Sequence, residues 1–169
     1  MEQSSIELYI TTDTDNPNFT KFHDNPVYIG AYLGHQLSQN YQDLNGKMAS
    51  FPSKSALQTQ SMNWCKQYGT YEVNGYKHRI FKYKDLFMLQ CLYLLRYKNL
   101  NSEQALGRGF IQGESSAFTG RLDEKGMYSG SSTSGASMDG IKFCGIEDLW
   151  GNLYCYVDEL SIKNVNRTD

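Results

Sequence analysis

The stretch GIEDLWGNLYCYVDEL, Gly145 to Leu160, carries the pattern on which the fold prediction depends. An acidic pair lies near each end, and Trp150, Tyr154 and Tyr156 surround a Gly-Asn pair. A strand that only filled a core would use aliphatic residues, so amphipathic rings on both sides of a turn indicate a turn that the architecture needs. Gly151-Asn152 suits it, because Gly accepts strained backbone angles and Asn can bond neighbouring amides.

The length and composition indicate one domain. The 169 residues have a mass of 19.3 kDa, and a domain of this size buries roughly 70% of its unfolded surface. Tyrosine is over-represented, with 13 residues against 8 Phe and 2 Trp, which fits either half-buried rings in a small β-rich fold or a recognition surface. With no internal repeat or strong linker, we predict an N-terminal extension over residues 1–25 and one domain over residues 26–169.

Charge and hydropathy argue against several classes of partner. The net charge of −2 provides no basic stripe for a phosphate backbone, so we expect no nucleic-acid binding. The longest apolar run, Leu86 to Leu95, is interrupted by Gln90 and falls short of the roughly 20 residues that span a bilayer. The N-terminus has neither the basic start nor the apolar segment of a signal peptide. We therefore expect neither membrane insertion nor a leader.

The cysteines and histidines do not suggest a zinc site. The four cysteines lie far apart without a CxxC pair, and the three histidines do not cluster with them. Most of the cysteines lie in apolar or aromatic surroundings, where a free thiol serves as a small buried hydrophobe. The residues concerned are Cys65, Cys91, Cys144, Cys155, His23, His35 and His78.

The first half of the chain predicts a strand, a helix and a hairpin. Residues 26–33 alternate and are rich in β-formers, which indicates a strand. A helix from Ser53 or Ser55 to Tyr68 follows from apolar residues at helical spacing. The Asn-Gly pair within Val73–Tyr76 is typical of a tight hairpin turn.

The second half predicts a central helix, a long loop and two strands. Tyr83–Tyr97 is apolar nearly all round, so we expect a helix buried on most of its surface. Gly and Ser are frequent from Gly107 to Gly140, which predicts a long surface loop. Strands are expected at Gly140–Gly145 and Leu153–Val157, joined by the Gly-Asn turn.

The opening stretch resembles the Gly-Asn-Val-Trp-Glu-Trp-Val run of the formylglycine-generating-enzyme-like (sulfatase-modifying-factor-like) branch of the C-type lectin fold, with residues 151–157 in register. Three further segments resemble blocks of that fold as it occurs in phage and prophage tail or fibre proteins. They are PVYIGAYLG (26–34), LQCLYLLRYKNLNSEQALGRG (89–109) and IKFCGIEDLWGNLYCYVD (141–158).

The resemblance implies an α+β, C-type lectin-like fold, in which two helices flank a small twisted antiparallel sheet and long irregular loops cover one face. Trp64 and Trp150 would then be core rings. Tyr154 and Tyr156 would either pin the Gly-Asn turn under the loops or contact a ligand, and we expect the former. The chain stops where related domains continue, so it is either a trimmed member or a fragment, and an exposed sheet edge would favour a homo-oligomer.

Departures from the family argue against catalysis and against a cofactor. The enzyme branch uses a cysteine pair after the Gly-Asn block, and the tail after Val157 contains no cysteine, so we expect no enzyme activity. The family's calcium-holding carboxylate is replaced by Cys155, which weakens any calcium site because hard cations need several oxygens. Asp148, Asn152 and Asp158 remain as weak metal candidates, the alternative being solvated turn acids.

The resemblance implies a non-catalytic virion protein, of a phage tail or fibre or encoded in a prophage, that binds a host-surface protein or glycan and contacts other virion proteins. The alternative is a structural or adaptor component that uses the fold only for assembly. Within the Gly/Ser-rich loop we expect the ligand to contact Phe118, Arg121, Met127 and Tyr128, since aromatic and Arg anchors carry binding energy. Alternatively, Phe118 and Tyr128 fasten the loop to the domain.

Overall fold

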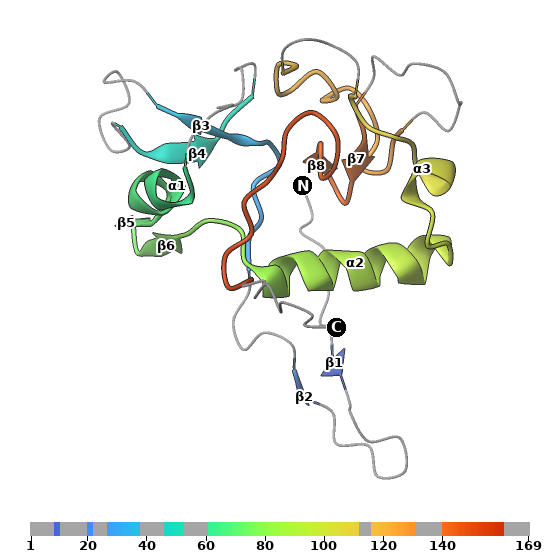
Figure 1. Cartoon of the computed structure of the whole chain (residues 1–169), viewed down its shortest axis with the longest axis horizontal. Helices are drawn as coiled ribbons and strands as arrows, with labels where there is room; N and C mark the ends of the chain where they lie inside the picture. The colour runs from blue at the N-terminus through green and yellow to red at the C-terminus, as the bar shows by residue number, and fades with distance from the viewer. Residues whose placement is uncertain are drawn as a thin grey trace, which may run out of the picture.

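The computed structural model describes residues 9–10, 20–21, 27–37, 46–52, 61–111, 116–130 and 140–160. Within these ranges the chain is mixed α/β, with three helices and eight short strands (Figure 1). The strands form four separate two-stranded antiparallel sheets instead of one twisted sheet between two helices. The predicted mixture of helices and antiparallel strands is confirmed, whereas the C-type lectin-like arrangement is not.

The helices and strands are short, apart from one helix. The helices are α1 (Met62–Gly69), α2 (Tyr83–Tyr97) and α3 (Ser102–Ala105). The sheets pair β1 (Tyr9–Ile10) with β2 (Thr20–Lys21), β3 (Gly34–Gln36) with β4 (Met48–Ser50), β5 (Tyr71–Val73) with β6 (Tyr76–His78), and β7 (Lys142–Phe143) with β8 (Ile146–Glu147).

Two of these sheets are hairpins with the same turn chemistry. Asn74 and Gly75 have φ of 51° and 78° between β5 and β6, so the predicted Asn-Gly hairpin is confirmed. Cys144 and Gly145 have φ of 52° and 78° between β7 and β8. Positive φ at both central positions makes strands turn back tightly, and Cys is an unusual residue for the first of them.

The predicted strand over residues 26–33 is wrong in its described part, 27–33, because β3 begins only at Gly34. The backbone of residues 27–33 bonds to other segments without forming a ladder: Tyr32 N donates to Ser50 Oγ at 2.8 Å, and Glu147 N donates to the Ala31 carbonyl at 2.8 Å. The alternation of apolar and polar residues in this segment therefore reflects contacts on two sides of an irregular backbone.

The strands predicted in the last third are also corrected. Only Lys142–Phe143 of the first is a strand, because the chain turns back at Cys144 and Gly145. Leu153–Val157 forms no strand. Its Tyr154 is fully exposed and Tyr156 is nearly half exposed, so these rings do not pin the turn as expected.

Helix α1 begins later than predicted. Ser61 is its N-cap, with an extended backbone and a side chain that accepts from Trp64 N at 3.2 Å, so the helix does not start at Ser53 or Ser55. Those two positions lie outside the described residues. Trp64 is only half buried and lies against Tyr68 with ring centroids 4.6 Å apart, which corrects its placement as a core ring.

Helix α2 has the predicted bounds but not the predicted burial. Its start is closed by Asp85, whose carboxylate accepts from Lys82 N at 3.0 Å and pairs with Arg79. Leu89 and Tyr93 are buried, whereas Leu95 is 69% exposed. The expectation of burial on most of the surface is therefore wrong, and one apolar side of α2 faces solvent at its C-terminal half. In the described part of the chain, no helix has the length and hydropathy to cross a bilayer.

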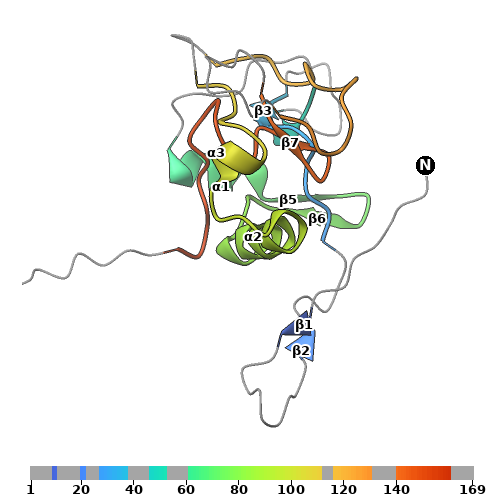
Figure 2. The same cartoon turned by 90° about the vertical axis from the view of Figure 1, so that its right-hand side faces the viewer.

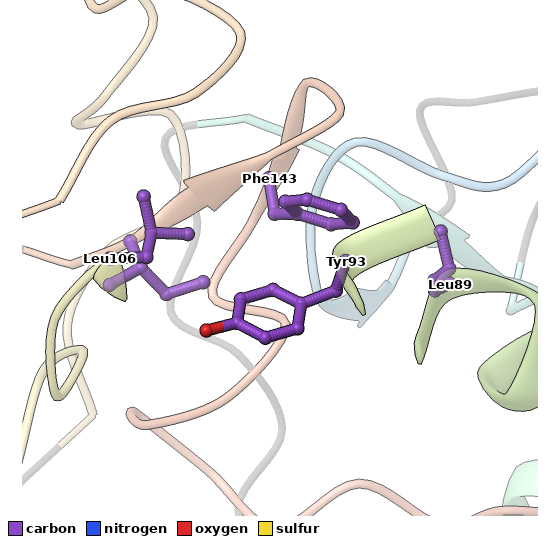
Figure 3. Packing of buried hydrophobic residues seen from close by; sticks show 5 residues of the cluster. Leu89, Tyr93, Leu106 and Phe143 are labelled. Atoms are coloured by element: carbon purple, nitrogen blue, oxygen red, sulfur yellow. The ribbon is translucent and has the colours of Figure 1, made fainter. Parts of the chain in front are cut away.

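The core lies between α2 and the β7–β8 hairpin (Figures 1 and 2). Phe143 lies over Tyr93, with Leu106 on one side and Leu89 on the other (Figure 3). The rings of Tyr93 and Phe143 are 5.8 Å apart at 60°, and Trp150 meets Tyr93 edge-on at 6.0 Å. Ile141 completes the buried cluster, and Trp150 packs against it only partly buried, its indole N–H donating to Gly107 O at 2.9 Å.

A matched pair of leucines on α2 tests this arrangement. Leu89→Ala should lower the free energy of unfolding by about 2–5 kcal/mol because it opens a cavity beside Phe143. Leu95→Ala should change it by no more than about 0.5 kcal/mol, since Leu95 is exposed. Urea unfolding of both variants measures the difference, and equal losses would contradict the proposed orientation of α2. Half-buried Leu92 should give an intermediate value.

Candidate binding site

The Gly-Asn turn of the opening stretch is a point where two backbones cross. A Cβ on Gly151 would meet Phe110 N at 2.8 Å and Gly109 C at 3.0 Å, and Gly151 has a φ of 81°. Asn152 N donates to Phe110 O at 2.6 Å. The Asn152 amide also bonds Ala117, accepting from its N–H at 2.9 Å and donating to its carbonyl at 3.3 Å. The predicted tight turn is confirmed, and its hydrogen bonds fix the backbone at Phe110 and at Ala117.

Next to this turn, whose Asn152 bonds Asp148, Arg121 joins two buried carboxylates. Its Nη1 donates to Glu147 Oε1 at 3.0 Å and its Nη2 donates to Asp148 Oδ1 at 2.7 Å, while both carboxylates are 1% exposed. Glu147 also accepts from the N–H groups of Gly120 and Leu122, both at 3.1 Å. One guanidinium therefore fastens the 118–122 turn to the end of the β7–β8 hairpin.

The cluster is short of positive charge. It contains two carboxylates and one guanidinium, and the Arg121 Nε, which is buried, has no hydrogen-bond partner among the described residues. Burial raises the pKa of Glu147, and neighbouring Asp148 adds to the rise, while the Leu122 N–H, Arg121 and the Gly120 N–H oppose it. Gly140 closes the site, because a Cβ there would collide with both Arg121 Nη2 and Asp148 Oδ1.

The three metal candidates do not come together on one cation site. Asp148 Oδ1 accepts from Arg121, and its Oδ2 accepts from Asn152 Nδ2 at 2.8 Å. Asp158 lies beside the start of α2, where its carboxylate pairs with Lys66 at 2.5 Å and its backbone bonds Phe81 and Tyr83. Within the described ranges, no group of three or more His, Cys, Asp or Glu side chains is placed to hold a metal. Any calcium at Asp148 would have to displace the guanidinium.

An open groove lies between the C-terminal half of α2 and the β7–β8 hairpin, with a volume of about 340 Å³. Leu92, Leu95 and Arg96 line it from α2, Phe143 and Cys144 line it from the hairpin, and Tyr128 comes from the long loop. Most of this lining is apolar, and Arg96 provides its one charge. The groove is the continuation of the buried core to the surface, since Phe143 belongs to both.

Tyr128 is held on three sides in this groove. The Arg96 guanidinium lies over its ring at 3.5 Å from the centroid, and Phe143 meets it edge-on at 5.7 Å. The Cys144 thiol donates to its hydroxyl at 3.6 Å, and this hydrogen bond, followed by burial, raises the pKa of Tyr128. Ser129, the next residue, exchanges two backbone hydrogen bonds with Lys142. An aromatic side chain that is 37% exposed is thus fixed in one orientation.

The structure separates the four predicted ligand-binding residues. Tyr128 lines the groove, and exposed Met127 is next to it, with its carbonyl accepting from Gly145 N at 3.0 Å. Phe118 is exposed elsewhere on the loop, and its carbonyl accepts from Arg121 at 2.9 Å. Arg121 serves the buried cluster instead of an exposed surface.

Sequence reasoning missed Leu95, Arg96 and Cys144 as groove residues. One feature of the sequence could have indicated this surface: Arg96 is a charged residue at the end of a helix that is otherwise apolar on nearly every side. Such a cation has to reach solvent or a partner, which marks the side of α2 that is not buried.

Comparison of the chain with protein-family models, with curated proteins and with solved structures gives no match.

The buried cluster yields a stability prediction with a pH dependence. Arg121→Met should lower the free energy of unfolding by about 3–5 kcal/mol at neutral pH, since it leaves two buried carboxylates without a counter-charge. Folding raises the pKa of Glu147, so its contribution to stability is present below pH 4.5 and is lost as the pH rises through the folded pKa. The cost of Arg121→Met should therefore shrink as the pH falls towards 4.5.

Chemical unfolding at several pH values measures this effect, and Arg108→Met is the control. Arg108 pairs with exposed Glu103 at 3.0 Å, so its loss should cost no more than about 1 kcal/mol. Equal, pH-independent losses in the two variants would show that Arg121 is an ordinary surface cation.

Proposed function

We propose that this chain is a non-catalytic recognition protein that binds its partner through the groove beside α2. The observation that carries the proposal is the fixed, partly exposed ring of Tyr128 above an apolar floor. A rigid aromatic wall gains contact area at little cost in conformational entropy, which is what binding surfaces use. The setting, a phage or prophage tail or fibre protein that binds a host-surface protein or glycan, comes from the sequence resemblance.

The composition of the groove favours binding over catalysis. Its lining contains a thiol at Cys144 but no His, Asp or Glu that could act as a general base towards it. None of the four cysteines is in a disulfide, and burial raises the pKa of the Cys65 thiol, which disfavours the nucleophilic thiolate. The residues therefore suit contact rather than bond making.

The exposed leucines favour a second candidate function, that of an adaptor or structural virion component. Leu94, Leu95 and Leu100 present aliphatic side chains to solvent at the end of α2 and just after it. Apolar surface of this kind is often covered by another protein chain. A homo-oligomer or a contact with a different virion protein would cover it equally well.

A pair of charge-introducing substitutions tests the recognition function. Leu95→Asp places a carboxylate in the groove, whereas Leu100→Asp places one on an 88% exposed side chain that does not line it. We expect Leu95→Asp to weaken binding to immobilised host cell-envelope material by tenfold or more, about 1.4 kcal/mol, with Leu100→Asp binding like the parent. Melting temperatures measured in parallel check folding.

The outcomes separate the two candidates. If Leu95→Asp binds the envelope material as well as the parent does, the groove is not the recognition surface. If the parent fails to bind that material but self-associates in sedimentation, and Leu95→Asp abolishes the self-association, the adaptor function is correct.

A further inference from the structure

We infer that the groove accepts a protein segment in which a carboxylate lies next to aliphatic side chains, in preference to a glycan. This inference rests on the proposed binding function and adds the chemistry of the partner. It follows from three properties of the groove: the state of Arg96, the charges around it, and the accessibility of the Tyr128 ring.

Arg96 is exposed and has no ion-pair partner in the described ranges of the chain. The central carbon of its guanidinium lies over the Tyr128 ring, 3.5 Å from the centroid, and 5.7 Å from the centroid of the Tyr97 ring. Stacking on a ring uses a face of the guanidinium and leaves the N–H donors at its edge available. A carboxylate can take two of those donors side by side, and the stacked, pre-oriented guanidinium loses little freedom when it binds.

The charges near Arg96 favour an anion. Asp85 is the one acid of α2, and it is buried at the opposite end, where it pairs with Arg79. Arg96 and Lys98 stand at the C-terminal end. The helix dipole puts roughly half a negative charge at that end, which two full positive charges outweigh. No lining residue is acidic, so a bound carboxylate would meet no like charge in the groove.

The shape and lining favour aliphatic side chains beside that carboxylate. Leu92, Leu95 and Phe143 present apolar surface, and the volume of about 340 Å³ is at the small end of ligand pockets, roughly 300–1,000 Å³. Such a space holds a few side chains of a peptide segment. Burial of those side chains provides the favourable free energy, and the Arg96 contact determines which segment binds.

A glycan fits this groove less well. Sugars stack their apolar faces on exposed aromatic faces and need several polar groups for their hydroxyls. Here one face of Tyr128 is covered by the Arg96 guanidinium, Phe143 packs against the ring at a steep angle, and the Tyr128 hydroxyl bonds Cys144. Of the other lining residues, Leu92, Leu95 and Phe143 have no side-chain hydrogen-bonding group, so Arg96 is the one charged donor that the groove offers to several sugar hydroxyls.

The experiment compares short synthetic peptides, acetylated and amidated at their ends, on the full chain. One set carries a glutamate beside a pair of Leu, Ile or Phe residues; matched sets replace the glutamate with glutamine or the apolar pair with alanine. A linear glucose oligosaccharide is the glycan probe. The readout is the NMR shift of the Arg96 side-chain Nε–H and of the Tyr128 and Cys144 amides during titration.

We expect the glutamate peptides to shift these signals and to bind about tenfold more tightly than their glutamine counterparts. Arg96→Gln should remove that tenfold preference, and Arg96→Lys should retain only part of it, because an ammonium keeps the charge without the planar fork. Lys77→Gln, which removes one charge on exposed β6 at the other end of the molecule (Figure 1), should keep the preference.

Three results would overturn the inference: equal binding of glutamate and glutamine peptides, an oligosaccharide that shifts the groove signals while peptides do not, or no shift with any probe. None of these results decides the proposed function, which is tested separately by the binding of Leu95→Asp to envelope material. If Leu95→Asp still loses envelope binding, the groove is the recognition surface and only the partner chemistry is wrong. If Leu95→Asp keeps envelope binding while glutamate peptides bind through Arg96, the groove binds a different protein.

Discussion

The ion cluster in which Arg121 bridges Glu147 and Asp148 is the interaction on which the architecture depends. The described strands pair only two by two, and the long loop meets the β7–β8 hairpin near Ser129 through a single antiparallel bridge to Lys142. The cluster provides the connection at the other end of residues 118–130: it uses backbone N–H groups from the 118–122 turn, a guanidinium from the same turn, and carboxylates from the end of the hairpin. Its surplus negative charge is tolerated because each carboxylate oxygen has a donor, which is the condition for burying such groups.

The β7–β8 hairpin is held from two sides with different chemistry. Its aromatic face, through Phe143, packs on Tyr93 of α2 (Figure 3). Its polar end, through Glu147, is bonded to the loop. The Gly109–Gly151 crossing lets the two backbones approach closely enough for Trp150 to reach the same core. A hairpin fixed in this way positions its own turn, so Cys144 and the neighbouring Tyr128 are set by packing elsewhere in the molecule.

Local signals in the sequence were enough for the local features of the structure. Apolar periodicity located α2, Asn74-Gly75 located a hairpin, and Gly151-Asn152 located a turn, because each depends on neighbours within a few residues. The burial of individual side chains and the pairing of residues distant in the sequence could not be predicted from such local patterns. The sequence of a helix that is apolar nearly all round does not determine which side remains exposed. Arg121 lies in a Gly/Ser-rich loop and was therefore expected at a binding surface, but it pairs with Glu147, which is 26 residues away in the sequence. The groove combines residues from three segments, so only Tyr128 of its lining was anticipated as a ligand contact.

Arg96 and Arg121 show how the same side chain acquires opposite roles. Arg121 is surrounded by acceptors from its own chain, and its charge is neutralised within the fold. Arg96 has an aromatic ring beneath it and no carboxylate from the described chain beside it. A guanidinium stacked in this way is oriented but not neutralised, and its donors are satisfied by water until a better acceptor arrives. The lining next to Arg96 is apolar. A carboxylate that is attached to aliphatic side chains therefore gains both a charge-assisted hydrogen bond to Arg96 and the burial of apolar surface. A small anion gains only the hydrogen bond, and a purely apolar group gains only the burial.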